Sequence, residues 1–188
     1  MYKRQHIYIS LQEIISREIS ATKPAVVTIG KFAGGDAPNI IPGEVVMEGT
    51  IRSLDKEVGE FIFNRINDIA TSTAKMFRGE AQLIELSSVP PLTNDNNLAN
   101  EITNYMKDLV GEKSVVLFEA GGMGSEDLAS YSYEVPSLYV MLGAGIKQEN
   151  TLYGEPMHSE KVVFNEDILP TGAAMHAYSA IMWLKNNK

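Results

Sequence analysis

The chain has 188 residues, of which 44% are hydrophobic and 21% charged, and it contains no cysteine. These fractions are close to globular averages, so collagen-like, intrinsically disordered and disulfide-scaffold classes are excluded. Without cysteine there is no thiolate nucleophile and no cysteine zinc site, which leaves histidine and the carboxylates as the strong metal ligands. The length suits one large domain or two small ones.

The net charge is −8, from 16 Lys and Arg against 24 Asp and Glu. Nucleic-acid affinity depends on basic side chains that displace counterions from phosphates, so this balance predicts no nucleic-acid partner. No apolar run approaches the roughly 20 residues that span a bilayer, and the first residues lead into no signal-type apolar core. We therefore expect a cytoplasmic protein with no membrane partner.

The spacing of apolar residues predicts five elements in the first half of the chain. They are a helix over residues 7–19, a strand over 25–30, a strand over 44–53, a helix over 55–78 that Asp55 caps, and a strand over 81–86. This order suits a small sheet with helices on one face, which is an α+β arrangement whose first strand is missing. Alternation along the second strand places Arg52 on the less apolar face.

A change of pattern separates the second half from the first. Residues 87–95 combine Pro90 and Pro91 with polar turn formers, so we place a domain boundary between residues 1–89 and 90–188. The later elements are a helix over 98–109, strands over 115–118 and 137–142, a glycine turn over 121–124 that leads into a helix, and a final helix over 167–185. The apolar centre of the strand over 137–142 implies a buried sheet, so the fold class overall is α/β.

Ser125 follows the glycine turn Gly121-Gly-Met-Gly124 and has the character of a helix N-cap. Glu126 and Asp127 then fall in the first helical turn, where two carboxylates stabilise the helix dipole and repel an anion. This argues against a phosphate site and favours a capping motif. A functional cleft stays open as the alternative, because glycines let a ligand approach the backbone closely.

The chain has three histidines. His158 lies in a polar loop, where histidines are more often ligands or proton carriers than in a core, although a hydrogen-bonded surface histidine is the alternative. His176 lies on the apolar side of the final helix and is predicted to be a core residue, and His6 carries no signal. One histidine cannot hold a catalytic zinc, which needs about three protein ligands, and no other residues complete a set by spacing.

Two polar residues of the first half have both a structural and a functional interpretation. Asn39 lies between Pro38 and Ile40, where an asparagine side chain commonly bonds its own backbone in a turn. Arg52 can be a solvated residue on the outer face of its strand. A role in ligand binding is the alternative for both.

Several runs of residues occur in the same order as the motifs of a known enzyme family. They are Leu11–Glu18, Pro24–Gly30, Gly34-Gly35, Ala37–Pro42, Gly49–Arg52, Gly124–Leu128, Leu142–Gly145, Met157–Ser159 and Asp167–Gly172. The first five resemble the dimerisation (lid) domain of the zinc amidohydrolases typified by hippurate hydrolase, aminoacylase and indole-acetyl-amino-acid hydrolase. The other four resemble the closing half of the same family's catalytic domain. The resemblance implies an α+β lid domain without its first strand, followed by the C-terminal part of an α/β zinc-hydrolase domain.

The resemblance also implies roles for the residues that match these motifs. His158 matches the family's last metal-ligand histidine. Asn39 and Arg52 match lid residues that reach toward substrate, and Ser125 and Glu126 match a Ser-Glu-Asp stretch near the cleft. In that stretch Leu128 stands where an aromatic residue is usual in the family.

The family's other metal ligands, its general-base glutamate and its lid histidine match no position in this chain. The resemblance therefore implies the C-terminal fragment of an enzyme that is inactive alone. The implied reaction is metal-assisted hydrolysis of an N-acyl amino acid, with one or two Zn²⁺ ions, or Mn²⁺, Co²⁺ or Ni²⁺ in their place. Arg52 would bind the substrate carboxylate and Asn39 would donate to the developing oxyanion. A homodimer through the lid domain is expected.

Two other functions are weighed against this one. The first is a non-catalytic dimerisation or carboxylate-binding module derived from the same fold, which would be a stable, zinc-free dimer. The second is an active enzyme completed by a separate chain. We favour the incomplete hydrolase because half of a catalytic domain leaves apolar faces uncovered, and an independent module of this kind would tend to aggregate.

Overall fold

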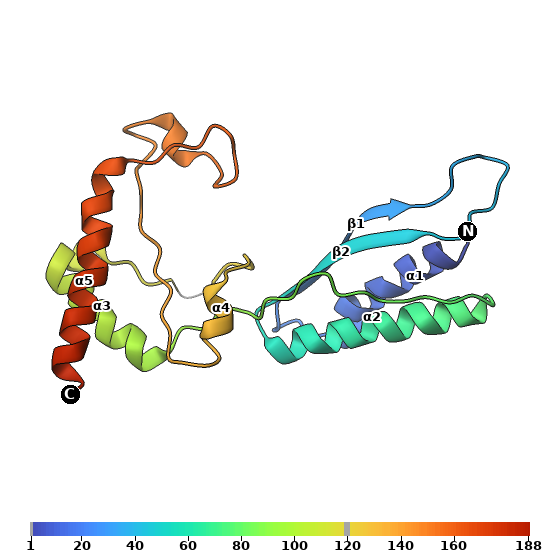
Figure 1. Ribbon diagram of the computed structural model, residues 1–188, viewed down its shortest axis with the longest axis horizontal. Coiled ribbons are helices and arrows are strands. Elements are labelled where there is room, and N and C mark those ends of the chain that lie inside the picture. Colours follow the sequence, from blue (N-terminus) through green and yellow to red (C-terminus); the bar gives the residue numbers. More distant parts are fainter. Residues whose placement is uncertain (1, 119–120) are drawn as a thin grey trace. The chain divides into compact units, whose positions relative to one another are not determined.

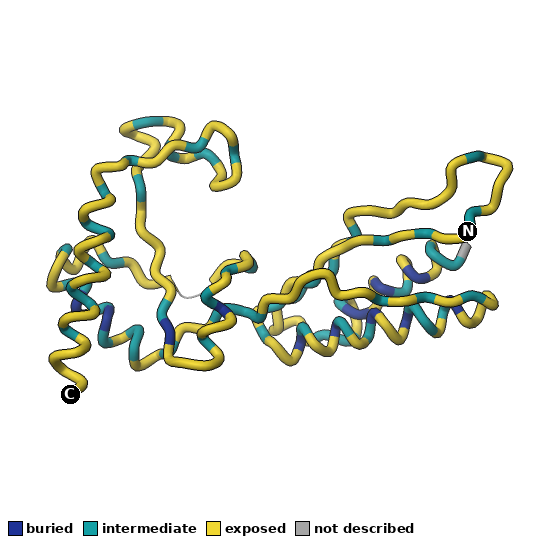
Figure 2. Tube along the Cα trace, viewed as in Figure 1, coloured by how far each residue is buried: buried dark blue, intermediate teal, exposed yellow. Residues whose placement is uncertain are grey.

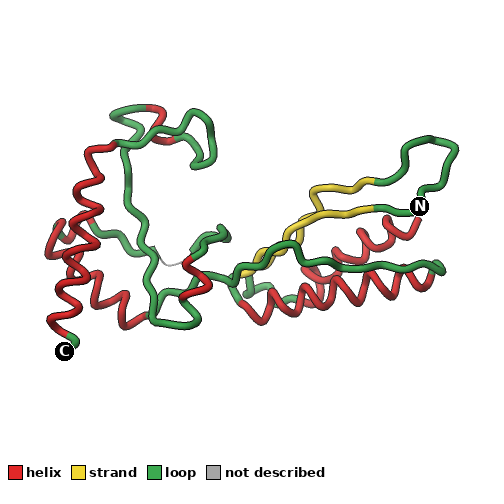
Figure 3. The backbone as a smooth tube through the Cα atoms, in the orientation of Figure 1, coloured by secondary structure: helices red, strands yellow, loops and turns green. Residues whose placement is uncertain are grey.

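A computed structural model describes residues 2–118 and 121–188 of the chain (Figure 1). The chain divides into two compact units. The first comprises Met1–Leu92 with Gly122–Ser130, and the second comprises Thr93–Gly121 with Tyr131–Lys188. Helices occur in both units, and the described strands lie in the first (Figure 3).

The first unit is a two-stranded antiparallel sheet with helices on one face. Its elements are α1 (Tyr2–Glu13), which continues into the π-helical turn η1 (Ile14–Glu18), β1 (Ala25–Ala33), β2 (Val46–Ser53) and α2 (Lys56–Met76). The two predicted helices and the two predicted strands that precede residue 80 are thereby confirmed, and the first helix begins earlier than residue 7. The α+β layer expected from the order of elements is present with two strands.

The core of the first unit lies between the helices and the inner face of the sheet. Ile7, Leu11 and Ile14 of the first helix meet Val58, Ile62, Ile66 and Ile69 of α2. Alternate strand residues pack against them, namely Ala25, Val27, Ile29, Met47 and Ile51. Figure 2 shows this as a run of buried positions along α1 and α2. The alternation predicted for β2 is therefore correct.

A β-bulge at Gly30 shapes the end of β1. Ile29 lies opposite Gly49 and Lys31 lies opposite Glu48, so Gly30 is an extra residue without a partner on β2. The extra residue restores Phe32 to the inner face, opposite Met47. There the Phe32 ring packs edge-on against Tyr8 of α1, with 5.9 Å between ring centroids.

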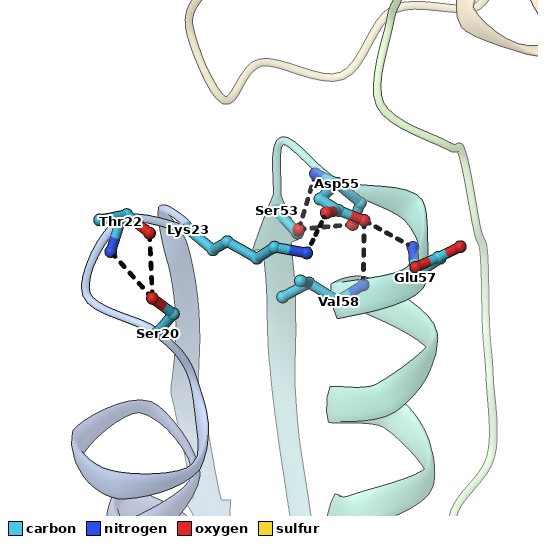
Figure 4. Close-up of polar contacts among 7 residues, drawn as sticks. All are labelled: Ser20, Thr22, Lys23, Ser53, Asp55, Glu57 and Val58. Carbon is cyan, nitrogen blue, oxygen red and sulfur yellow. Dashed lines mark hydrogen bonds and ion pairs between the residues drawn. The ribbon is translucent and has the colours of Figure 1, made fainter.

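Asp55 caps α2 as its sequence position predicts (Figure 4). Its carboxylate accepts hydrogen bonds from the backbone N–H groups of Glu57 and Val58, at 2.9 and 3.3 Å. Lys23 donates to the same carboxylate at 2.7 Å. The hydrogen bond from Lys23, helped by the backbone N–H groups, lowers the pKa of Asp55.

The strand predicted over residues 81–86 is not formed. The segment is extended and Leu83 packs against the core, but Ile84 and Leu86 are exposed. A strand requires a hydrogen-bonded neighbour, and within the described residues β1 and β2 pair only with each other. The segment is apolar as predicted, but it has no hydrogen-bonded neighbouring strand among the described residues.

The second unit is held by two helices, α3 (Asn96–Val110) and α5 (Leu169–Asn186). Ile102 and Tyr105 of α3 are buried, and the Asn186 side-chain amide donates to the Tyr105 hydroxyl at 2.7 Å. Shorter turns of this unit lie between them in the chain: η2 (Glu112–Ser114), η3 (Thr151–Gly154) and η4 (Glu166–Ile168). The short helix α4 (Leu128–Tyr131) belongs to the first unit up to Ser130. The helices predicted over 98–109 and 167–185 are confirmed.

The buried sheet predicted for the second half is absent from the described residues. Residues 115–118 and 137–142 are extended without strand pairing, and Phe118 is 76% exposed. The second segment is held instead by Asn94, whose side-chain amide bonds both the N–H and the carbonyl of Tyr139, and by the Asp95 N–H, which donates to the Ser137 carbonyl. These hydrogen bonds resemble the bonds between two paired strands, but they are too few to form a sheet.

The structure also corrects the environment predicted for α5. None of its residues is buried, and His176 is exposed rather than part of a core. Among the described residues α5 contacts α3, and near its start Leu142 lies against Gly172. No helix in the described ranges combines the length and apolar character needed to cross a membrane.

Candidate functional site

Arg52 lies near the end of β2, opposite Val26 of β1, on the outer face of the sheet. Its guanidinium is exposed, and Nη1 donates a 2.6 Å hydrogen bond to the backbone carbonyl of Met123. Met123 belongs to the Gly122–Ser130 segment of the same unit. The other N–H groups of Arg52 have no acceptor among the described residues, so the planar fork is free to bind a carboxylate.

Ser125 and Glu126 follow directly after this contact. Ser125 is exposed and Glu126 half-buried. The helix that follows starts at Leu128, three residues beyond Ser125, and it is Glu126 whose carboxylate accepts from the Leu128 N–H, at 3.3 Å. The prediction that Ser125 is the N-cap is therefore wrong, and the side-chain acceptor at the start of this helix is Glu126. The structure thus brings Arg52, Ser125 and Glu126 into one region of the first unit.

Asn39 lies at the turn of the loop between β1 and β2, and its side chain is exposed. The turn is closed by the Ile40 N–H, which donates to the Ala37 carbonyl at 3.3 Å. Asn39 makes no side-chain hydrogen bond to any described residue, so the turn does not depend on its amide. That amide is available to a ligand, and Ile40 and Ile41 beside it are also exposed.

His158 lies in a turn of the second unit, between Met157 and Ser159, and its imidazole is exposed. The turn is closed by the Ser159 N–H, which donates to the Pro156 carbonyl at 2.8 Å. The prediction of a loop histidine outside the apolar stripes is confirmed. Its two ring nitrogens are open to a ligand from outside.

The metal-ligating residues do not form a complete site. Within residues 2–118 and 121–188, no three His, Asp or Glu side chains are grouped so that they could hold an ion. A catalytic zinc needs about three protein ligands, of which the single histidine His158 could supply at most one. These residues alone therefore do not fit a resident metal.

Sequence reasoning missed the partner of Arg52. A backbone carbonyl leaves no mark in the sequence, although Gly122 and Gly124 on either side of Met123 leave that backbone uncovered by side chains. An added Cβ at Gly124 would meet nothing within 4 Å. Glycines that flank one larger residue are the only signal that could have indicated an accessible carbonyl here.

Comparison with known proteins places these residues in a family. Residues 10–181 match Peptidase family M20/M25/M40. The chain is 32% identical over 183 residues to the IAA-amino acid hydrolase ILR1-like 2 of Arabidopsis thaliana, covering 95% of this chain and 40% of that protein. It is 30% identical over 186 residues to the hippurate hydrolase of Campylobacter jejuni, covering 98% of this chain and 46% of that protein.

Solved structures agree with this relationship. A crystal structure of a protein from methicillin resistant Staphylococcus aureus matches with a TM-score of 0.82 and 27% identity, over 97% of this chain and 46% of that one. The Bacillus subtilis YXEP protein, a dinuclear metal binding peptidase, has the same fold with a TM-score of 0.77 and 22% identity, over 98% and 46%. The chain thus spans less than half the length of these relatives, and it belongs to Peptidase family M20/M25/M40.

Proposed function

We propose that these residues are the C-terminal part of a metal-dependent amidohydrolase that cleaves the amide bond of N-acyl amino acids. The match with hippurate hydrolase and IAA-amino acid hydrolase over 95–98% of this chain carries the proposal. Both names describe the hydrolysis of an amino acid joined through an amide. Residues 1–89 would be part of the lid (dimerisation) domain and residues 90–188 the end of the catalytic domain.

The groups available in the first unit suit one end of such a substrate. The free donors of Arg52 match the two oxygens of a carboxylate, which an N-acyl amino acid carries beside its amide. Asn39 would donate its side-chain amide to the oxygen on which negative charge develops. Ser125 and Glu126, next to the Arg52 contact, would line the same cleft.

His158 would hold one metal ion through a ring nitrogen, and the remaining ligands would come from residues that this chain does not contain. Zn²⁺ is the expected ion, with Mn²⁺, Co²⁺ or Ni²⁺ as substitutes that imidazole also accepts. The ion would polarise the amide carbonyl and activate a water molecule. The exposed imidazole of His158, in a turn of the second unit, supports this assignment.

We further propose that the first unit forms a homodimer through α1 and the open edge of β1. An open groove of about 600 Å³ lies there, lined by Gln5, His6, Tyr8, Ile9, Ile29 and Phe32. Ile9 is 66% exposed, and an unpaired strand edge beside an apolar patch favours association. In sedimentation we expect the wild-type chain to be a dimer and Ile9→Glu to be a monomer. A wild-type chain that sediments as a monomer, like the variant, would contradict the proposal.

The experiment for the catalytic proposal compares the 188-residue chain with a protein that also carries the rest of the family's length. Hydrolysis of N-acetyl-methionine and of hippurate is measured with and without Zn²⁺. We expect no activity from the chain alone and zinc-dependent activity from the longer protein. In the longer protein, His158→Ala should reduce kcat/KM by more than about 100-fold, beyond the loss typical of removing a group that merely orients a ligand. His176→Ala, an exposed histidine of α5, is the matched control and should retain activity.

Each other outcome has a definite meaning. Enzyme-like activity in the 188-residue chain would show that it is complete. Full activity of His158→Ala would remove the metal assignment. A stable zinc-free dimer that binds a carboxylate, with no activity in the longer protein, would support the non-catalytic binding module instead.

A further inference from the structure

The Arg52 contact joins two segments that lie far apart in the sequence. The Nη1 group of Arg52 reaches the Met123 carbonyl across 71 positions of the chain, and the residues that follow Met123 group with the first unit rather than with their sequence neighbours in the second. Ala129, near the end of this segment, is fully buried. The start of the segment is thus attached to β2 through Arg52.

We propose that Arg52 is a positioning residue that holds the Gly122–Glu126 segment on the lid sheet, so that Ser125 and Glu126 move with the lid. The hydrogen bond uses only Nη1, and the remaining guanidinium donors keep a fixed direction because β2 and the Met123 carbonyl hold the two ends of the side chain. Arg52 would then determine where Ser125 and Glu126, two other candidate substrate-binding residues, lie. This consequence rests on the proposed function, whereas the attachment itself does not.

The geometry explains why an arginine is suited to this task. A guanidinium can donate to a carbonyl with one nitrogen while a second nitrogen faces another acceptor, which a lysine ammonium does with less directional control. The glycines on both sides of Met123 leave the carbonyl accessible, as the open space at Gly124 shows. A glycine-flanked backbone is also the most flexible kind, so a single fixed bond has a large effect on its order.

Amide hydrogen exchange in the 188-residue chain tests the attachment, with no metal or substrate present. The reporters are the N–H groups of Leu128, Ala129 and Ser130, which donate to the Glu126 carboxylate, the Glu126 carbonyl and the Asp127 carbonyl. Arg52→Met keeps an unbranched apolar stem and removes the donors of the guanidinium. Arg52→Lys restores one donor. Arg17→Met, at an exposed arginine of η1, controls for the loss of one positive charge.

We expect these three amides to exchange about threefold to tenfold faster in Arg52→Met, which corresponds to the net loss of one hydrogen bond. Arg52→Lys should lie within about twofold of the wild type, and Arg17→Met should match it. Equal exchange in Arg52→Met and wild type would overturn the proposal. So would an acceleration in Arg52→Met that is as large in the β1 and β2 amides as in these three, because the sheet and not the attachment would then have been lost.

The outcome is separable from that of the catalytic experiment. A failed exchange test leaves the hydrolase proposal standing, with Arg52 as a substrate ligand only. An inactive longer protein leaves the attachment standing, since exchange is measured without catalysis.

Discussion

Arg78 adopts a positive φ of 55°, a conformation that favours glycine. It ends α2 in a Schellman motif, in which the Gly79 N–H donates to the Ala74 carbonyl and the Arg78 N–H to the Lys75 carbonyl. Gly79 thus lies one residue after the left-handed position, which Arg78 occupies and where a glycine would avoid the strain.

Arg78→Gly should therefore raise the free energy of unfolding of the first unit by about 0.5–1 kcal/mol, as the strain of a left-handed arginine is removed. Lys75→Gly, in the last turn of the same helix, should lower it by about the same amount, because glycine there costs helix propensity. Urea unfolding followed by circular dichroism measures both. A decrease for both variants would show that Arg78 is not strained.

Glu18 ties the end of η1 to α2 through Arg65, whose Nε donates to both carboxylate oxygens at 3.0 and 2.7 Å. The hydrogen bond from Arg65 lowers the pKa of Glu18. A carboxyl with a depressed pKa in the folded state stabilises the fold above its unfolded pKa, and this contribution is lost as the pH falls through the folded value.

The stability of the first unit should therefore decrease as the pH falls below about 4.3, the ordinary glutamate pKa. Glu18→Gln should be less stable than the wild type at pH 7 and should lose less stability on acidification. Glu44→Gln, an exposed glutamate in the β1–β2 loop, is the control and should follow the wild type. Parallel pH profiles for wild type and Glu18→Gln would contradict the role given to this ion pair.

At the scale of elements, local patterns were sufficient where the backbone hydrogen bonds are local. The helices α1, α2, α3 and α5 and the hairpin of β1 and β2 follow from apolar spacing, the Asp55 cap and turn residues, because the hydrogen bonds of a helix or a hairpin form between residues close in sequence. The strands expected over 81–86, 115–118 and 137–142 are not formed, since a strand needs a neighbour that pattern alone does not supply. The bulge at Gly30 and the Arg52 bond to a backbone carbonyl were also beyond sequence reasoning, as both depend on register and tertiary placement.

The β1–β2 hairpin gives an element-scale prediction at Gly49. A Cβ at this position would lie 2.2 Å from the backbone carbonyl of Thr28, so one strand must shift to admit it. Gly49→Ala should lower the free energy of unfolding of the first unit by about 1–3 kcal/mol, the usual cost of overpacking. Gly43→Ala, in the loop where a Cβ meets nothing within 4 Å, should change it by less than about 0.5 kcal/mol. Equal effects in urea unfolding would contradict the close packing assigned to Gly49.

At the scale of the whole molecule, each unit has helices that pack well and extended apolar segments that do not. Leu117 is 71% exposed, whereas Ile102 on α3 is 8% exposed. An apolar segment of this kind is stable only when further residues cover it, which agrees with a chain that spans less than half the length of its relatives.

Leu117→Glu should therefore change the stability of the 188-residue chain by less than about 0.5 kcal/mol and should reduce its aggregation. In a protein that carries the rest of the family's length, the same variant should be strongly destabilising, because a charge would then be buried. Ile102→Glu should unfold the second unit in both proteins. Trp183 fluorescence during urea unfolding measures these effects, and destabilisation of the short chain by Leu117→Glu would show that the segment is already covered.

Zinc binding by the 188-residue chain is the most direct test of the central claim, that His158 is one ligand of a metal site whose other ligands lie outside these residues. Titration calorimetry followed by gel filtration should show weak binding that His158→Ala abolishes, with no zinc retained on the column. Tight stoichiometric zinc that survives gel filtration, or binding unchanged in His158→Ala, would contradict the account.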